Sequence, residues 1–322
     1  MSDLYLADVT DEVKKEAIRV GFGRGLVRAG ERDQNVVAAC ADLTGSIKMD
    51  GFAKAFPERF IQIGIGEQNL ATVGAGLALK GKIPFVASYA AFSPGRNWEQ
   101  IKTTACLNEV PVKIVGGHAG LYTGPDGATH QMLEDIVLMR VMPHMVTIVP
   151  CDSAQAEKAT LAMAQDNRPN YIRLCREETP CITTEKTPFE IGKAYVYAKG
   201  ADVTIIACGV MVYQALLAAE QLFKDGIDAE VINVPTIKPL DSETILRSVK
   251  KTRCVVTAEE GQMNGGLGGA VAELLGENDP VPIKRIGVKD RYGESGEGGQ
   301  LMTHFGLDAQ HIRLAAHHVV DR

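Results

Sequence analysis

The sequence predicts an α/β protein with two doubly wound domains whose sheets are mostly parallel. Apolar, strand-like runs alternate with helix-like stretches along most of the 322 residues, as in a parallel sheet covered by helices. The alternation stops in the polar stretch 177–191 (EETPCITTEKTPFEI) and then resumes. This length also suffices for two domains of ordinary size. We therefore expect domains at residues 1–185 and 186–322.

The first domain is predicted from two kinds of pattern, taken in chain order. Amphipathic stretches indicate helices, and the first of them is entered at Thr10 or Asp11; the helices are expected at 11–29, 98–107, 133–141 and 154–164. Short apolar runs indicate strands at 35–41, 82–88, 111–115, 145–149 and 171–174. The stretch 60–81 combines both, as a strand that leads into a helix.

The second domain shows the same alternation over a shorter length. Strands are expected at 203–208, 229–234, 253–258 and 281–286, and helices at 211–224, 242–250 and 268–275. In doubly wound sheets, ligands bind beyond the carboxyl ends of the strands. Polar residues that follow a predicted strand are therefore the first candidates for a functional site.

Composition limits the partners and the compartment. The net charge of −6 argues mildly against nucleic acid as a general partner, because phosphate backbones bind basic surfaces. No run of 18 apolar residues occurs, and MSDLYLADVTDEVKK lacks the apolar core of a signal peptide. The seven cysteines show no pair at two-residue spacing, which favours buried free thiols over a zinc site. We expect a cytoplasmic protein without membrane contact.

Glu67 lies where the strand of the stretch 60–81 (FIQIGIGEQNLATVGAGLALKG) meets its helix. The helix is rich in alanine and glycine, which predicts close packing and poor solvation of the carboxyl group. Desolvation raises the pKa of a carboxyl group, which suits proton exchange with a ligand. Alternatively, Glu67 only places negative charge in the first turn of the helix, where it is favourable.

Other candidates also follow predicted strands. The loop HAGLYTGPDGATHQ (118–131) holds two histidines and an aspartate between glycines that let a ligand approach the backbone. Residues 41–46 (ADLTGS) and the arginines of RLCRE (173–177) follow two further strands, and Tyr89 and Phe92 could form a wall for a planar ring. Each has an ordinary alternative: a solvated loop, a polar turn, surface ion pairs and core aromatics.

Several motifs together resemble the C-terminal half of transketolase, the thiamine-diphosphate enzyme that moves two-carbon ketol units between sugar phosphates. They are ADLTGS, the GEQ at 66–68, HAGLYTGPDGATHQ, MPHMVTIVPCDSAQ (142–155) and RLCRE. Their order and spacing resemble those of the family over nearly the whole chain. The resemblance implies a pyrimidine-binding domain followed by a transketolase C-terminal domain.

The resemblance assigns cofactor contacts. Glu67 resembles the glutamate that hydrogen-bonds the aminopyrimidine ring and drives its imino tautomer, a role that requires a shared proton in a dry site. Tyr89 and Phe92 fall where the family stacks aromatic rings on the pyrimidine, whereas FSPGRNW (92–98) departs from the family pattern around Trp98. Asp42 and Leu43 resemble the pair that touches the cofactor and holds it bent.

It also assigns substrate contacts. Asp126 resembles the aspartate that reads the hydroxyl next to the acceptor's aldehyde, and His130 a histidine near the reacting carbons. The residues that resemble the family's sugar-phosphate ligands are Arg19, Ser46, His118 and Arg176. Two arginines and a histidine would let an acidic protein hold a phosphate dianion.

One family feature is absent from this sequence. A complete transketolase carries an N-terminal domain whose Gly-Asp-Gly motif and downstream asparagine hold the metal, and no such motif occurs here. The resemblance thus implies a subunit of a split enzyme, in an α2β2 heterotetramer with an N-terminal-half partner. Thiamine diphosphate would be shared, and the partner would bind Mg²⁺ or Ca²⁺.

Three alternatives remain at this level. A deoxyxylulose-phosphate-synthase-like subunit would share the DGxTH loop, but not DLTGS or a histidine at position 118. The β subunit of a 2-oxo acid dehydrogenase would share the two-domain layout but lack that loop. A non-catalytic relative would have no need to keep Glu67, Asp126, His130 and Arg176 together.

Overall fold

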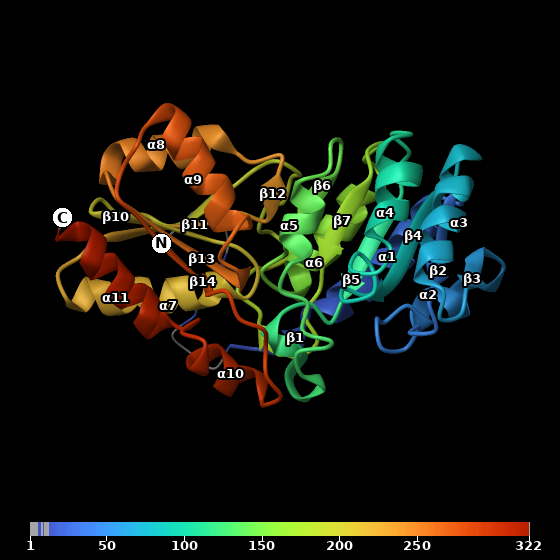
Figure 1. Ribbon diagram of the computed structural model, residues 1–322, viewed down its shortest axis with the longest axis horizontal. Coiled ribbons are helices and arrows are strands. Elements are labelled where there is room, and N and C mark those ends of the chain that lie inside the picture. Colours follow the sequence, from blue (N-terminus) through green and yellow to red (C-terminus); the bar gives the residue numbers. More distant parts are fainter. Residues whose placement is uncertain (1–5, 8, 10–12, 322) are drawn as a thin grey trace.

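The structure is a computed structural model that describes residues 6–7, 9 and 13–321. Two sheets, of seven and of five strands, lie side by side with helices around them (Figure 1). Both sheets are mostly parallel, which confirms the predicted fold class. A two-stranded antiparallel ribbon, β1 (Lys15–Ala17) with β8 (Glu178–Pro180), completes the strand pairing.

The seven-stranded sheet has the order β12-β6-β7-β5-β4-β2-β3, and only β12 runs antiparallel to its neighbour. Its strands are β2 (Val36–Cys40), β3 (Phe60–Gln62), β4 (Ile83–Tyr89), β5 (Lys113–Gly117), β6 (Val146–Ile148), β7 (Asn170–Arg173) and β12 (Thr236–Lys238). The helical segments around it are α1 (Ile18–Arg32), α2 (Asp50–Ala55), η1 (Pro57–Arg59), α3 (Glu67–Leu79), α4 (Trp98–Gln100), η2 (Ile101–Cys106), η3 (Leu121–Asp126), α5 (Asp135–Arg140) and α6 (Ser153–Met163).

Alternate side chains of each strand point to opposite faces of this sheet. Ala38 joins the apolar cluster of α1, α2 and α6, whereas its neighbour Ala39 joins that of α3, η2 and α5. Both faces are therefore covered, as a doubly wound sheet requires. On the first face, α1 packs directly on α6, because a Cβ on Gly21 would lie only 1.8 Å from the Ser153 carbonyl oxygen.

The five-stranded sheet has the order β14-β13-β10-β11-β9, with β9 antiparallel. Figure 1 shows α8 and α9 on one side of it and α7 and α11 on the other. Its elements are β9 (Tyr195–Ala198), β10 (Val203–Ala207), α7 (Met211–Lys224), β11 (Ala229–Asn233), α8 (Ser242–Thr252), β13 (Val255–Gln262), α9 (Leu267–Asn278), β14 (Ile283–Val288), α10 (Gly298–His304) and α11 (Ala309–Val320).

Side chains cap three of the helices. Asp152, Asp241 and Asp308 precede α6, α8 and α11, and each accepts a hydrogen bond from a backbone N–H of the first turn. Such caps satisfy donors that have no partner within the helix.

All seven cysteines are free and all but Cys181 are buried, as predicted. Among the helices in the described ranges, none is long and apolar enough to cross a membrane.

Three sequence predictions need correction. The first helix begins at Ile18 and not near residue 11, because residues 15–17 form β1; the predicted entry at 10–11 lies outside the described residues. The stretch 177–191 is not irregular throughout, since it contains β8. The structure also holds elements that were not predicted: α2, β9, β12, α10 and α11.

Strand β12 crosses between the two halves of the chain. It follows β11 of the second sheet, yet it pairs antiparallel with β6 and forms an edge of the first sheet. One apolar cluster also runs from Phe22 in α1 to Val203 in β10. The two sheets are therefore joined by a shared core and by backbone hydrogen bonds.

Candidate active site

Glu67 is the first residue of α3 and is almost fully buried, with 3% of its surface exposed. The small residues behind it are required by the packing, because a Cβ on Gly74 would lie 2.6 Å from Val86 on β4. The predicted close packing and poor solvation of this carboxylate are confirmed. Its place in the first turn also gives it favourable contact with the helix dipole.

Arg96 supplies the counter-charge of Glu67. Its Nη1 lies 2.8 Å from Oε2 of Glu67, while half of the arginine side chain is exposed. The guanidinium also lies over the Phe92 ring, 4.8 Å from its centroid. Asn97, which is buried, donates a hydrogen bond of 2.8 Å to the Glu67 carbonyl oxygen. The sequence reasoning missed both residues, because about thirty positions separate them from Glu67.

Two aromatic and two histidine rings form one cluster at the ends of β4 and β5. The Tyr89 ring stacks on His118, with centroids 3.8 Å apart and an interplanar angle of 27°. The ring centroids of Phe92 and Tyr89 are 6.2 Å apart, and His130 forms T-shaped pairs with Tyr89 and Phe92 at centroid distances of 6.2 and 5.5 Å. The strands are parallel neighbours, with Tyr89 opposite Gly117, so their carboxyl ends bring Tyr89 and His118 together.

Arg19 and Arg176 place positive charge beside this cluster, close to His118. Burial, with the charge of Arg176, lowers the pKa of Arg19. Burial, with the charges of Arg19 and Arg176, lowers the pKa of His118 to about 3. Arg19 Nε and His118 Nδ1 are buried and have no hydrogen-bond partner in the described part of the chain. Buried donors without partners are rare and indicate a site for a polar ligand.

Ser46 and Asp126 lie next to these cations. Arg19 Nη1 donates a hydrogen bond to the carbonyl oxygen of Ser46. Arg176 Nη1 lies 3.6 Å from Asp126 Oδ1 and donates to the carbonyl oxygen of Thr123, whose hydroxyl donates to the carbonyl oxygen of His118. The structure thus joins the substrate-side candidates at one place, although they come from α1, the β2–α2 loop, η3 and the segment after β7.

Asp42 and Leu43 follow β2 at the same edge of the sheet. Asp42 is exposed with φ of +58°, and its N–H donates to the Gln62 side chain at 2.8 Å. Leu43 packs on the first apolar cluster. Trp98 lies elsewhere: its Nε1 donates to the Leu138 carbonyl oxygen, and its ring packs on the second cluster. It does not join the aromatic wall, in agreement with the departure seen in the sequence.

A buried charge network supports the loop from behind. Arg173 is paired with Asp135 at 3.0 Å and with Glu260 of β13 at 3.5 Å. Burial raises the pKa of Glu260 to about 7 despite this arginine. Glu260 Oε1 accepts a hydrogen bond of 2.7 Å from the Tyr122 backbone N–H. The second sheet thereby fixes η3, the turn that carries the candidate Asp126.

His118 is expected to stay neutral in the free protein down to about pH 4. Its folded pKa is about 3, below the ordinary value of about 6.5, so the folded state binds fewer protons and this group's contribution to stability falls as pH falls from 6.5 to 3. An NMR titration of the ring measures this directly. Exposed His144 is the control; a His118 midpoint near 6.5 would contradict the burial and charge argument.

Two family models match the chain: the transketolase pyrimidine-binding domain over residues 14–181 and the transketolase C-terminal domain over residues 192–312. The fold is that of the pyrimidine-binding and C-terminal domains of transketolase. The chain belongs to the transketolase family. Within the described residues, no group of three or more His, Cys, Asp or Glu side chains is arranged to hold a metal ion.

Similar proteins span nearly the same length. A 6-deoxy-6-sulfo-D-fructose transketolase subunit of Clostridium sp. (strain MSTE9) is 44% identical over 92% of both chains. A putative transketolase C-terminal section of Methanocaldococcus jannaschii is 43% identical over 92% of this chain and 94% of its own. A solved structure, "Split gene transketolase, inactive beta4 tetramer", has a TM-score of 0.89 and 43% identity, covering 95% of this chain and 98% of that one.

A relative with another activity also matches. The 1-deoxy-D-xylulose-5-phosphate synthase of Syntrophus aciditrophicus is 36% identical over 91% of this chain, which spans 46% of that protein. This relative corresponds to one of the alternatives that the sequence left open.

Proposed function

We propose that the chain is the subunit of a split transketolase that binds the pyrimidine end of thiamine diphosphate. In this proposal it transfers two-carbon ketol units from ketose phosphates such as xylulose 5-phosphate to aldose phosphates such as ribose 5-phosphate, in the cytoplasm. A partner chain supplies the diphosphate-binding domain and its Mg²⁺ or Ca²⁺, in an α2β2 heterotetramer. Relatives of the same span that are named as a subunit or a C-terminal section support the division.

The observation that carries the proposal is the convergence of two cations, Arg19 and Arg176, on the neutral His118 ring that stacks on Tyr89. In a protein of net charge −6, two arginines converge there; Asp126 and Glu177 lie 3.6 Å from Arg176, whereas Arg19 forms no ion pair with a carboxylate in the described part of the chain. Charge-assisted contacts of this kind recognise phosphate. A sulfonate carries the same type of anionic oxygen, so a sulfosugar is the second candidate donor, favoured by the Clostridium relative.

The residues at the site fit the pyrimidine end of the cofactor. Tyr89 and Phe92 offer ring faces, Asp42 and Leu43 lie at the neighbouring strand end, and Glu67 offers a buried carboxylate. When bound, thiamine diphosphate supplies the carbon nucleophile that takes up the ketol unit. Glu67 would hold a proton at the aminopyrimidine ring nitrogen, and its dry surroundings would keep that proton from water.

The substrate-side residues have separate tasks in this proposal. Arg19, Arg176, His118 and Ser46 would bind the phosphate group, and His118 can donate a hydrogen bond through its one N–H while remaining neutral. Asp126, held by Arg176, would accept a hydrogen bond from the hydroxyl next to the acceptor's aldehyde. His130, whose Nδ1 lies 2.9 Å from the Thr129 hydroxyl, would exchange protons near the reacting carbons.

The exposed side chain of Ile65, beside Glu67, fits a contact with a partner chain. Ile65, two residues before Glu67, is 80% exposed, and Leu79 at the end of α3 and Leu107 after η2 are 65% and 78% exposed. Large apolar side chains with such exposure are typical of a surface that another protein covers.

The direct test is co-expression with a chain that carries the diphosphate-binding domain. The purified complex is assayed with thiamine diphosphate and Mg²⁺ for transfer from xylulose 5-phosphate to ribose 5-phosphate, with 6-deoxy-6-sulfofructose as a second donor. Ketol transfer from either donor supports the proposal, and the donor that is used identifies the donor class. A complex that prefers pyruvate to both donors moves the chain to the synthase or dehydrogenase alternative.

The isolated chain is expected to be inactive and to bind thiamine diphosphate weakly, because the diphosphate and metal contacts are assigned to the partner. Titration calorimetry with cofactor and Mg²⁺ measures this, and the reconstituted complex is the control. Micromolar binding by the chain alone would count against the split arrangement.

Arg176→Ala is expected to lower kcat/KM ten- to a hundredfold for xylulose 5-phosphate, since one charge-assisted contact contributes about 1.5–3 kcal/mol. Hydroxypyruvate has no phosphate, so the loss with that donor should nearly vanish. The control is Arg247→Ala, which changes an exposed arginine on α8. Equal losses of kcat/KM with both donors would show that Arg176 supports the fold and does not bind the phosphate group.

A further inference from the structure

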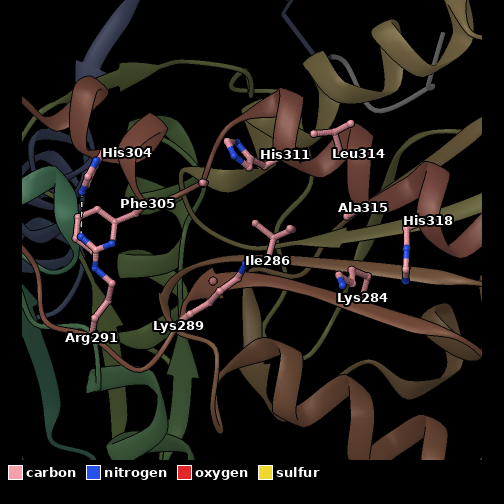
Figure 2. A pocket seen from close by; sticks show the side chains of 12 residues that line it. Lys284, Ile286, Lys289, Arg291, His304, Phe305, His311, Leu314, Ala315 and His318 are labelled. Atoms are coloured by element: carbon pink, nitrogen blue, oxygen red, sulfur yellow. Dashed lines mark hydrogen bonds between the residues drawn. The ribbon is translucent and has the colours of Figure 1, made fainter.

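A second concave site lies in the C-terminal half, away from the sheet edge described above. It is bounded by β14, the end of α10 and the outer face of α11, and it encloses about 480 Å³. Figure 2 shows Arg291 and His304 at one end of this hollow, Lys284 and His318 at the other, and Ile286 between them. We call it the α11 pocket.

The α11 pocket is strongly basic. Six of its lining residues are cationic or can become so: Lys284, Lys289, Arg291, His304, His311 and His318. Three of them are paired with carboxylates: Glu294 pairs with Arg291 and His304, and Asp308 pairs with His311. Over the described ranges, Lys284, Lys289 and His318 have no ion-pair partner. This concentration contrasts with the net charge of −6 for the whole chain.

Contacts among the lining residues fix the position of Arg291 in the α11 pocket. The Arg291 guanidinium is held over the Phe305 ring at 4.0 Å, and its Nη2 lies 3.0 Å from His304 Nε2. Leu314, which is 57% exposed, and Ala315 form an apolar wall between the two basic ends. A planar guanidinium fixed by stacking is well suited to bind a phosphate oxygen pair.

One rim of the α11 pocket is tied to the loop of the candidate active site. Glu294 binds Arg291 and His304 through its side chain, while its carbonyl oxygen accepts a hydrogen bond of 2.8 Å from Gln131 Nε2. Gln131 also donates to the carbonyl oxygen of Gly124 inside η3. The start of α10 packs on the same turn, since a Cβ on Gly298 would lie 3.0 Å from Tyr122.

We propose that the α11 pocket binds a small phosphorylated molecule with anionic groups near both ends, and that its binding shifts the loop 118–131 through Glu294 and α10. The basic ends match such a molecule, the apolar wall matches its uncharged middle, and the volume matches a small metabolite. A ligand that draws Arg291 and His304 into the pocket competes with Glu294 for them. The Gln131 contact then links occupancy to the residues proposed to bind the acceptor.

The binding test follows the histidine ring signals of the full chain by NMR during titration with fructose 1,6-bisphosphate. The variant Arg176→Ala serves as background, to weaken binding at the first site. Signals of His304, His311 and His318 should shift saturably, and Lys289→Ala with Arg291→Ala should weaken binding at least about tenfold. Lys250→Ala, an exposed lysine on α8, should change nothing. Glu294→Ala should tighten binding, because it removes an anion from the rim.

The proposed binding site would be overturned if the signals of these three histidines stay fixed, or if they move equally with sulfate at the same concentration. The coupling is read in the reconstituted complex as a change in KM for the acceptor on adding the bisphosphate. That change should disappear in the Lys289→Ala, Arg291→Ala double variant. Saturable binding with an unchanged KM would overturn the coupling. None of these NMR outcomes depends on the proposed transferase activity, so the two proposals fail separately.

Discussion

Glu67→Gln is expected to slow activation of the cofactor in the reconstituted complex by at least about a hundredfold, the usual scale for loss of an acid–base group. The amide keeps the size of the buried carboxylate and still forms hydrogen bonds, but it has no ionisable proton to exchange with the ring nitrogen. Proton exchange at C2 of the cofactor's thiazolium ring, followed by NMR after rapid quenching, measures this step apart from substrate binding.

The matched control is Glu99→Gln, which makes the same chemical change at an exposed position of α4. It should leave exchange unchanged. If Glu67→Gln exchanges at the wild-type rate, the role of Glu67 is only to place negative charge in the first turn of α3. Arg96→Gln adds information, since it removes the ion pair while leaving the carboxylate in place.

Arg173→Ala is expected to lower the free energy of unfolding by about 3–5 kcal/mol, the usual cost of breaking a buried ion pair. The change leaves Asp135 and Glu260 buried, at 0% and 2% exposure, without their cation. Urea unfolding of the full chain measures the loss. Arg253→Ala, which removes an exposed arginine paired with Asp279, should cost no more than about 1 kcal/mol.

The cost of Arg173→Ala should also depend on pH. The pKa of Glu260 is already raised to about 7 by burial, and removal of the cation raises it further. A carboxyl group with a raised folded pKa binds more protons in the folded state, so stability is lost as pH rises above the unfolded value of about 4.3. The deficit should therefore be larger at pH 8 than at pH 5. A deficit independent of pH would indicate lost packing alone.

The sequence predicted most of both sheets, because a buried strand needs an apolar run and a covering helix needs a periodic face. Strand β2 and helix α7 illustrate this: β2 is apolar and buried throughout, and every buried residue of α7 is apolar, although Phe223 near the end of α7 is 74% exposed. Strand β12 was not predicted, because a strand of three residues is too short to display the alternation of apolar and polar residues. Helix α11 shows an apolar face and an aspartate cap, so closer reading of the C-terminal stretch would have found it.

The candidate site was predictable where strand ends and motifs coincide, as for Tyr89, His118 and Asp42. It was not predictable where long-range packing decides. Arg96 reaches Glu67 from 29 positions away, and Glu260 reaches Arg173 from 87 positions away. Nothing in a local pattern of charges selects these pairs, because oppositely charged residues far apart in sequence have many possible partners.

The shared edge strand β12 also imposes an order on biosynthesis. While the ribosome is still making the second half of the chain, β6 has an unpaired edge, and at ordinary elongation rates β12 follows on the order of ten seconds later. Until then this edge can pair with other nascent chains. Cutting the gene within residues 177–191 would leave the edge permanently open, so the halves on either side of this stretch are not interchangeable modules. A fusion that exchanged only the C-terminal half would have to bring a β12 that matches β6.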